Sequence, residues 1–237
     1  MACKATRPIM VKSMLTMQNC RNFVTSLHQQ TSRDYLARML DEKIHCMDVA
    51  CQFGEQYWDG DRRYGYGGYR FIQGRWRPVA EALIKEYQLD QRSSVLDIGC
   101  GKAFLLHEIK LLIPEIKIVG IDVSEHGIKS ATNLVKGSLL KFDARAELPF
   151  ANEEFSLVIS LGALHNFRLP ELALTIPEIS RVGERSYIMV ESYRNNAELF
   201  NLQCWALTAK SFLDPDEWIW LLNDRGYRGE FEFIFFE

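Results

Sequence analysis

Short apolar runs alternate with amphipathic segments over most of the chain. The apolar runs are rich in Val, Ile and Leu and predict strands over residues 94–100, 117–122, 138–144, 155–161 and 185–192. Apolar positions between and after these runs recur at helical spacing, which predicts helices over residues 102–113, 125–135, 169–182 and 215–225. Such alternation is typical of βαβ units, whose strands pair in parallel and whose helices cover both faces of the sheet. We therefore expect a doubly wound α/β fold with a mostly parallel sheet.

The N-terminal third of the chain follows another pattern. Helical spacing of apolar residues over 31–56 predicts one or two helices. Residues 58–70 then contain four Gly and three Tyr, a density of glycine that interrupts helices and strands and indicates a loop. Pro78 stands at a position typical of the first turn of a helix. We therefore divide the chain into residues 1–77, with a basic arm, helices and the Gly/Tyr-rich loop, and one domain over residues 78–237.

The arm itself, residues 1–33, carries only basic charges. It contains Lys and Arg, is rich in Ser and Thr and has no acid, which is the composition of a mitochondrial transit peptide. A basic arm ahead of the first helix explains the same residues. We favour the arm because the pattern continues into Tyr35 and Leu36 without a break typical of cleavage. The expected compartment is therefore the cytoplasm, with the mitochondrion as the alternative.

Composition and charge exclude several classes of protein. Apolar residues make up 47% of the chain and charged residues 25%, as in soluble globular proteins. Basic residues number 28 against 31 acidic ones, so no overall positive charge indicates binding to duplex nucleic acid. No apolar run is long enough for a membrane-spanning helix. The six Cys form no CxxC pair, which favours reduced thiols, and we expect no metal site.

Acidic residues and glycines follow the predicted strands. In open α/β sheets, ligands bind at the carboxyl ends of the strands. The first strand reaches Asp97 and is followed by Gly99 and Gly101, which allow a tight turn and a close approach of the backbone to a ligand. The next two strands reach Asp122 and Asp143, whose carboxylates suit ribose hydroxyls and the edge of an adenine. Each Asp alone equally fits a helix cap, but together they indicate a nucleoside site.

These motifs resemble those of a known family. VLDIGCGKA at 95–103, VGIDVS at 119–124 and FDARAELPFANEEFSLVISLGALHN at 142–166 are similar to the successive motifs of class I S-adenosylmethionine-dependent methyltransferases, especially the small-molecule group that includes the ubiquinone and menaquinone methyltransferases. The resemblance covers about residues 94–192 and implies a Rossmann-like fold with S-adenosylmethionine as the cofactor. It further implies that the cofactor is bound by Asp97, Gly99, Cys100, Gly101, Asp122, Val123, Asp143, Ala144, Leu161 and Gly162.

The chain departs from the family pattern in two places. Ala103 replaces the third glycine of the first motif, a change small enough to leave the turn intact. The family fold ends with a helix and an antiparallel hairpin, whereas only one strand-like segment follows Arg225, so we expect a sheet that is one C-terminal strand short. A nicotinamide-dependent oxidoreductase is the main competing interpretation, but its GxGxxG motif requires glycine where this chain has Phe104.

The resemblance implies an enzyme that transfers a methyl group to O, N or C of a small molecule. The methyl group of the cofactor is electrophilic, so the protein chiefly has to align the acceptor and exclude water. A general base is needed where the acceptor is protonated. His165, beyond the fourth strand, is the first candidate for this base, and Glu191 is the second, although a structural role fits either residue.

The Gly/Tyr-rich loop and nearby arginines indicate how ligands are held. We interpret the loop as a lid whose tyrosines, Tyr64, Tyr66 and Tyr69, close over the cofactor or acceptor, with the glycines as hinges. Arg70 and Arg75 make this region basic, and their planar guanidinium groups suit carboxylates and phosphates. The expected acceptor is therefore an anionic metabolite or sugar, although a solvated basic loop is the plain alternative.

Two further expectations concern partners and turnover. The C-terminal segment EFEFIFFE offers an edge for pairing between subunits, which makes a homodimer one expectation. The alternative to an enzyme is a binding module that keeps the fold and holds a cofactor or a partner without turnover. Release of S-adenosylhomocysteine distinguishes these two hypotheses.

Overall fold

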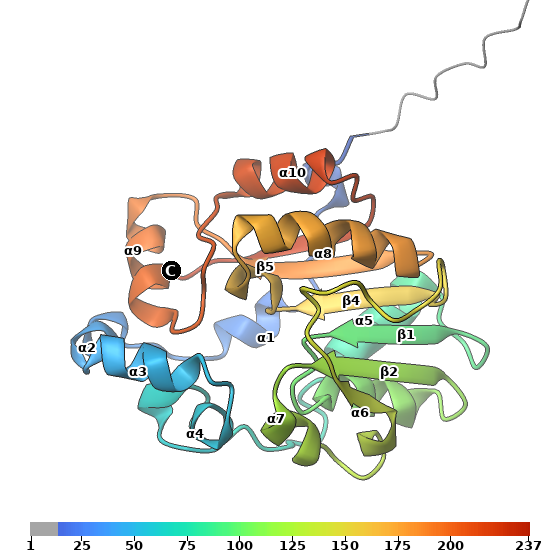
Figure 1. Cartoon of the computed structure of the whole chain (residues 1–237), viewed down its shortest axis with the longest axis horizontal. Helices are drawn as coiled ribbons and strands as arrows, with labels where there is room; N and C mark the ends of the chain where they lie inside the picture. Colours follow the sequence, from blue (N-terminus) through green and yellow to red (C-terminus); the bar gives the residue numbers. More distant parts are fainter. Residues whose placement is uncertain (1–13) are drawn as a thin grey trace, which may run out of the picture.

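A six-stranded sheet runs through the centre of the computed structural model, which describes residues 14–237 (Figure 1). Its strands are β1 (Ser94–Ile98), β2 (Lys117–Asp122), β3 (Leu139–Lys141), β4 (Leu157–Leu161), β5 (Ser186–Glu191) and β6 (Glu230–Ile234). All neighbouring strands pair in parallel, in the order β3-β2-β1-β4-β5-β6. The doubly wound parallel α/β fold predicted from the sequence is confirmed.

Helices cover both faces of this sheet. α5 (Arg77–Tyr87) and α6 (Phe104–Leu112) pack on one face, and α8 (Leu169–Val182) and α10 (Pro215–Asp224) pack on the other (Figure 1). The remaining helices are α1 (Thr25–Gln29), α2 (Tyr35–Leu40), α3 (Lys43–Ala50), α4 (Glu55–Trp58), α7 (Glu125–Lys129) and α9 (Asn196–Trp205). The short helices α2, α3 and α4 gather beside the carboxyl ends of the strands, next to α9.

Two helices differ from the sequence prediction. The helix predicted over residues 125–135 ends at Lys129, because the Ser, Thr and Asn residues that follow are poor helix formers. The hydroxyl of Thr132 instead contacts Nδ1 of His107 at 2.6 Å. The helix α9 was not predicted, because its apolar residues do not line one face and so leave no periodic pattern.

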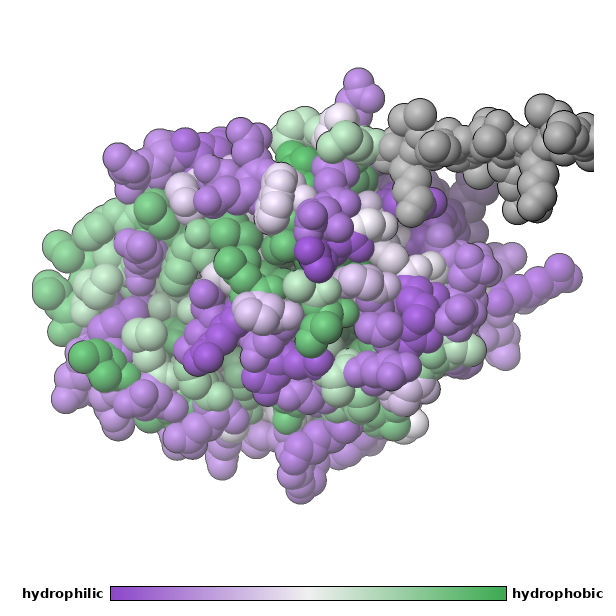
Figure 2. Space-filling view, turned by 45° about the horizontal axis from the view of Figure 1, so that its top comes forward, coloured by the Kyte–Doolittle hydropathy of each residue, from purple (hydrophilic) through white to green (hydrophobic). Residues whose placement is uncertain are grey.

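The described surface is mostly hydrophilic. Figure 2 shows hydrophilic residues over most of one face, with hydrophobic residues gathered on its left side and between them. Exposed large apolar side chains include Leu36, Leu40 and Ile44 of α2 and α3. Within residues 14–237, no helix is long and apolar enough to cross a membrane. The compartment expected from the sequence stays a prediction.

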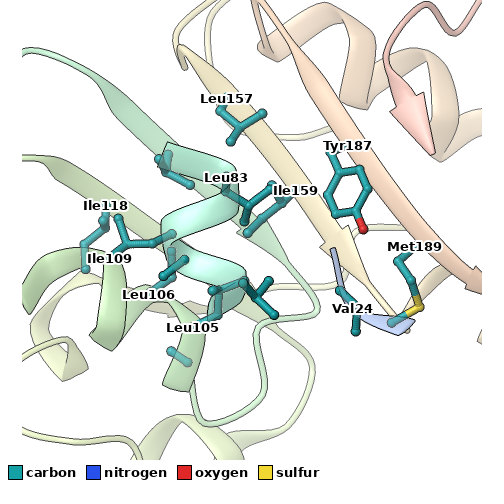
Figure 3. Packing of buried hydrophobic residues seen from close by; sticks show 14 of the residues in the cluster. Val24, Leu83, Leu105, Leu106, Ile109, Ile118, Leu157, Ile159, Tyr187 and Met189 are labelled. Carbon is teal, nitrogen blue, oxygen red and sulfur yellow. The ribbon is translucent and has the colours of Figure 1, made fainter. Parts of the chain in front are cut away.

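Strand residues alternate between two hydrophobic cores. Val95 and Leu157 face α5 and α6, whereas Leu96 and Val158 face α8 and α10. Figure 3 shows the first of these cores, in which side chains of α5 and α6 pack against β1, β2, β4 and β5. Because side chains alternate along a strand, Asp97 points to the same face as Val95, but at the carboxyl end of β1. The alternation therefore places this carboxylate beyond the edge of the core.

The N-terminal segment covers the outer edge of the sheet. Residues 1–13 of the predicted basic arm lie outside the described residues, but Leu15 and Val24 are buried against the fold. Cys20 forms a parallel bridge with Phe231 of β6. β6 is the last strand and pairs in parallel with β5, so the sheet ends one strand short, as expected. The expected homodimer would form through the C-terminal edge of the sheet. It stays a prediction.

The side chain of Glu232 joins this N-terminal segment to β6 by hydrogen bonds. Its buried carboxylate accepts hydrogen bonds from the backbone N–H groups of Phe23 at 2.7 Å, Val24 at 3.0 Å and Thr25 at 2.6 Å, and from the hydroxyl of Tyr187. Removing the carboxylate would leave several buried donors without an acceptor, and each such donor costs roughly 1–3 kcal/mol.

Replacing Glu232 with Ala is expected to lower the free energy of unfolding by about 3 kcal/mol or more, because the donors it serves have no other acceptor. Urea unfolding followed by circular dichroism measures this change. Glu184→Ala is the matched control, because Glu184 is exposed and its side chain makes no hydrogen bond within the described chain. Equal unfolding midpoints for the two variants would contradict the prediction.

Candidate functional site

A cavity of about 890 Å³ opens at the carboxyl ends of β1, β4 and β5. This is the edge where the chain turns to opposite sides of the sheet after β1 and β4, which is where α/β sheets bind ligands. The sheet side is lined by Asp97, Gly99, Cys100, Gly101, Leu161, Gly162, His165, Met189 and Glu191. The opposite side is lined by Tyr57, Trp58, Tyr66, Tyr69, Arg70 and Arg75 from the N-terminal part. The structure thus brings the first predicted motif, both predicted bases and most of the lid residues together.

Asp97 presents a buried carboxylate to this cavity. Its side chain is 5% exposed and has no hydrogen-bonding partner within residues 14–237. Burial, with a smaller contribution from the negative charge of Asp122, raises the pKa of Asp97 to about 8. A buried carboxylate without a partner is costly unless a cation or a donor enters beside it. The site is therefore prepared for a positively charged group.

The loop after β1 requires glycine at two positions. Gly99 and Gly101 have φ angles of 78° and 56°, in the left-handed region that glycine adopts without strain. A Cβ atom on Gly99 would lie 2.4 Å from Cβ of Ala163, and one on Gly101 would lie 2.5 Å from the ring of Trp58. Ala103 also adopts a left-handed conformation, with φ 54°, so the turn is intact despite the missing third glycine.

Asp122 is oriented by two backbone amides. Its carboxylate accepts the N–H of Gly101 at 2.8 Å and the N–H of Ser124 at 2.7 Å. Burial raises the pKa of Asp122, and these two hydrogen bonds oppose the shift. Asp122 does not line the cavity, because Trp58 covers both Gly101 and Ser124. The first Asp of the predicted nucleoside site therefore faces the cavity, whereas the second lies behind an aromatic ring.

The remaining predicted adenine residues lie outside the cavity as well. Asp143 is half-buried and accepts a hydrogen bond from Nε of Arg145 at 2.9 Å. Val123 is exposed, and the carbonyl of the buried Ala144 accepts the hydroxyl of Thr175. None of Asp122, Val123, Asp143 and Ala144 therefore lines the cavity that Asp97 faces.

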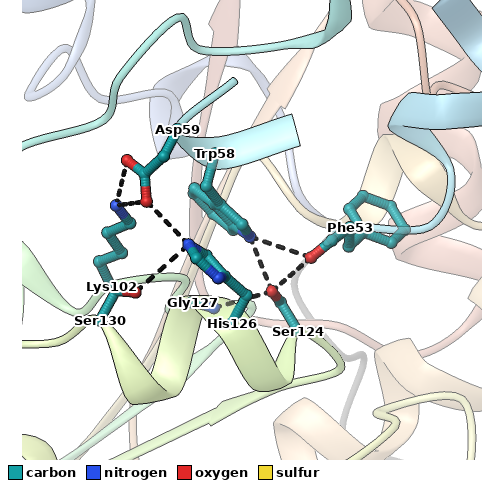
Figure 4. A network of polar contacts seen from close by, with 8 residues as sticks. All are labelled: Phe53, Trp58, Asp59, Lys102, Ser124, His126, Gly127 and Ser130. Atoms are coloured by element: carbon teal, nitrogen blue, oxygen red, sulfur yellow. Dashed lines mark hydrogen bonds and ion pairs between the residues drawn. The ribbon is translucent and has the colours of Figure 1, made fainter. Parts of the chain in front are cut away.

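A polar network holds the N-terminal part over the glycine loop (Figure 4). Nε1 of Trp58 donates to Oγ of Ser124 at 2.7 Å and to the carbonyl of Phe53 at 3.1 Å. Next to it, Asp59 contacts Nζ of Lys102 at 2.6 Å and Nε2 of His126 at 2.8 Å. Because Lys102 precedes α6 and His126 lies on α7, the network joins α4 to both loops that border the cofactor motifs.

His165 and Glu191 form a pair at the ends of β4 and β5. Nε2 of His165 lies 3.4 Å from Oε2 of Glu191, and Nδ1 of His165 accepts the backbone N–H of Glu191 at 3.4 Å. With Nδ1 as an acceptor, Nε2 carries the proton and lies beside the carboxylate, at a contact distance and without a hydrogen bond to it in this position. Both ring nitrogens are thus engaged by Glu191. The carboxylate of Glu191 keeps one oxygen, Oε1, outside this pair.

Two of the three predicted lid tyrosines line the cavity, and the third lies outside it. Tyr66 stacks on Trp58 with ring centroids 5.1 Å apart and is 44% exposed, because much of its ring faces the open cavity. Tyr69 packs against Tyr66 at 4.6 Å. Tyr64 instead lies outside the cavity, where it packs edge-on against His45 of α3.

Sequence reasoning missed Arg33 and Arg38 of the cavity wall as ligand-binding candidates. Arg33, Arg38, Arg62 and Trp205 lie together at one end of it. Arg33 and Arg38 belong to the predicted arm and first helix, and Trp205 belongs to a helix that was not predicted. No spacing along the chain indicates that these residues meet, so only the tertiary structure shows it.

Comparisons with known proteins agree with this geometry. The family described as "Methyltransferase domain" matches residues 89–226, which is more than half of the chain. A demethylmenaquinone methyltransferase of Thermotoga maritima is 23% identical over 222 residues, covering 82% of this chain and 93% of the relative. A malonyl-[acyl-carrier protein] O-methyltransferase of Legionella pneumophila is 34% identical over 92 residues, which cover 37% of this chain. The chain spans 31% of the length of that relative.

Solved structures show the same fold. A SAM dependent methyltransferase from Archaeoglobus fulgidus superposes with a TM-score of 0.50 at 23% identity, covering 65% of this chain and 69% of the other. The methyltransferase in a complex with the Haloferax volcanii Trm112 methyltransferase activator gives a TM-score of 0.52 at 22% identity, covering 62% and 66%. At this identity the similarity concerns the fold of the chain and not its acceptor.

Proposed function

The chain belongs to the methyltransferase domain family, whose cofactor is S-adenosylmethionine, and we propose that it methylates an O, N or C atom of a small anionic metabolite or sugar. The observation that most directly supports this proposal is the buried carboxylate of Asp97, which has no partner within the described residues. It faces a cavity that is also lined by His165, Glu191 and several arginines. The methyltransferase relatives do not favour the alternative of a non-catalytic binding module.

The residues of the cavity fit the methionine end of the cofactor. Asp97 would hold the ammonium group, whose positive charge supplies the partner that this carboxylate lacks. The backbone around Gly99, Cys100 and Gly101 and the wall formed by Leu161 and Gly162 would border the methionine chain. When bound, S-adenosylmethionine supplies an electrophilic methyl group.

The adenosine end of the cofactor would bind to the residues that Trp58 covers. Asp122 is held in place by the N–H groups of Gly101 and Ser124, and its oxygens keep lone pairs for ribose hydroxyls. Val123, Asp143 and Ala144 would lie against the adenine. Because Trp58 covers Gly101 and Ser124, binding at Asp122 requires that residues 54–70, which we call the strap, move from this position.

The pair at the ends of β4 and β5 would take the proton of the acceptor. Both nitrogens of His165 are occupied, so the carboxylate of Glu191 is better placed to accept a proton than the imidazole. His165 then acts as a positioning residue, because its Nδ1 accepts the backbone N–H of Glu191 and its Nε2 lies beside one carboxylate oxygen. This reverses the order of the two candidates that the sequence suggested.

The strap supplies a test of the lid hypothesis. Replacing Tyr66 and Tyr69 together with Ala is expected to lower kcat at least about tenfold, because their rings form the wall that orients ligands and excludes water. Steady-state kinetics measures the change, with the thermal midpoint as the check on folding. Tyr64→Ala is the matched control, since Tyr64 lies outside the cavity. Unchanged kinetics in the double variant would remove the lid hypothesis.

Two measurements test the function itself. Calorimetry with S-adenosylmethionine is expected to show binding, whereas a nicotinamide dinucleotide is expected to show none. A screen of anionic metabolites is then scored by released S-adenosylhomocysteine. Binding without product for any acceptor would favour the binding module, and absence of cofactor binding would contradict the proposal.

A further inference from the structure

Three arginines from separate segments meet at one end of the cavity. Arg33 precedes α2, Arg38 lies on α2, and Arg62 belongs to a short 3₁₀ helix in the strap (Arg62–Tyr64). Their guanidinium carbons lie 5.4, 4.5 and 4.9 Å from the centroid of the Trp205 ring at the end of α9. Three positive charges therefore gather around one aromatic ring that borders the cavity.

No acid of the described chain forms an ion pair with this cluster, which we call the arginine triad. None of the ion pairs formed within residues 14–237 includes Arg33, Arg38 or Arg62. The neighbouring Arg63 is different, because it pairs with Asp41 at 2.7 Å and with Glu42 at 2.6 Å. Asp41 and Glu42 thus pair with an arginine that does not line the cavity.

The hydrogen bonds of the arginine triad all go to neutral acceptors. Arg33 donates to the carbonyls of Thr31 at 2.9 Å and His28 at 3.3 Å, and its Nε is buried without any partner. Arg38 donates to the carbonyls of Trp205 at 3.1 Å and Arg62 at 2.8 Å. These contacts fix the positions of the guanidinium groups, and the two acids whose charges act on them, Glu191 on Arg33 and Asp41 on Arg38, form no ion pair with them.

The electrostatics of the triad confirm that the charges oppose one another. Burial, followed by the positive charge of Arg62, lowers the pKa of Arg38 to about 10. Burial lowers the pKa values of Arg33 and Arg62 as well. Burial is the largest cause of all three shifts, and an anion that enters the cavity beside these guanidinium groups would oppose it.

We propose that Arg33, Arg38 and Arg62 form a subsite that binds a doubly charged oxyanion, a phosphate group or a dicarboxylate, on the acceptor. The proposal deepens the function proposed above and rests on it for the role of the anion as part of the methyl acceptor. A dianion is favoured over a monocarboxylate because three unpaired guanidinium groups face the same space, and forked donors match oxyanions with two contacts each. Glu191 lines the same cavity, and its charge acts on Arg33, so the acceptor would lie between the triad and this carboxylate.

The alternative is a purely structural role for the triad. Cation–π contacts with Trp205 and hydrogen bonds to carbonyls would then only fasten α2 and the strap to α9. A structural role predicts that the variants lose stability but that the protein has no affinity for dianions. Direct binding of simple anions separates the two roles.

The experiment is calorimetric titration of the full chain, without cofactor, in a low-salt buffer. The probes are pyrophosphate, inorganic phosphate, malonate and acetate. The wild type is expected to bind pyrophosphate or malonate at least tenfold more tightly than acetate. Arg38→Gln and Arg62→Gln are each expected to weaken dianion binding at least tenfold, and Arg92→Gln, an exposed arginine away from the cavity, is expected to leave it unchanged.

Failure of the anion subsite can be distinguished from failure of the proposed function. Titration of S-adenosylhomocysteine into the same samples reports the cofactor site on its own, so loss of one binding event does not imply loss of the other. Arg62→Gln carries the test if Arg38→Gln does not fold, because Arg62 is more exposed. A preference for pyrophosphate assigns a phosphate to the subsite, and a preference for malonate assigns a dicarboxylate. The wild type failing to bind dianions, or both variants binding them like the wild type, would overturn the proposal.

Discussion

Asp97→Asn is expected to weaken binding of S-adenosylmethionine at least about 100-fold. The carboxylate is buried, faces the cavity and has no hydrogen-bonding partner within the described chain, so a bound ammonium group would be its only counter-charge. Removing one member of a buried charge pair costs roughly 2–5 kcal/mol, which is about 30- to 5,000-fold in affinity, and the expected loss lies within this range. Calorimetry with S-adenosylhomocysteine measures the affinity, and Asp48→Asn on the exposed surface of α3 is the matched control.

The same substitution is expected to stabilise the protein at pH 8. The pKa of Asp97 is raised to about 8 in the folded protein, whereas an unfolded Asp has its ordinary value near 3.8. Between these two values the folded state holds the proton that the unfolded state releases, so the free energy of unfolding falls as pH rises through this window. Above the folded pKa the loss is complete. Asn cannot ionise, so the variant escapes this loss.

Urea unfolding of the wild type and Asp97→Asn from pH 4 to pH 9 measures the effect. The wild type is expected to lose stability across the window, by at most about 1.4 kcal/mol per pH unit, and the variant to lose less. If the variant is more stable but binds the cofactor more weakly, Asp97 lowers the stability of the protein and contributes to cofactor binding. If the free energy of unfolding depended on pH in the same way in both proteins, burial would not raise the pKa of Asp97.

Glu191→Gln is expected to lower kcat about 100-fold or more while changing the affinity for S-adenosylhomocysteine only slightly. General bases contribute roughly 100- to 10,000-fold to the rate, and the amide cannot accept the proton. His165→Asn is expected to cause a smaller loss, because His165 orients the carboxylate without taking the proton itself. Steady-state kinetics with an acceptor from the metabolite screen measures both losses.

Glu184→Gln serves as the control for this second prediction, because Glu184 is exposed. A larger loss in His165→Asn than in Glu191→Gln would restore the imidazole as the base. An unchanged kcat in both variants would indicate that alignment of the acceptor is sufficient and that no base is used.

The local parts of the fold and site could be predicted because their signals lie within short stretches of sequence. Apolar runs such as residues 94–98 and 186–191 are buried strands whatever their neighbours are, and the structure confirms them. Gly99 and Gly101 follow the first strand directly, and their left-handed conformations agree with the tight turn. The helix α9 escaped prediction because its apolar residues follow no single face.

By itself, the sequence determined the order of strands and helices, the glycine loop and the acid at the end of β1, because these depend on residue spacing and local backbone preference. Only the tertiary structure decided that Trp58 covers Asp122, that Glu191 engages both nitrogens of His165, and that three arginines surround Trp205. Such contacts join residues far apart in the chain, and they arise from how the N-terminal segments pack over the sheet. Spacing along the chain does not encode that packing, so the chemistry of the cavity became visible only in three dimensions.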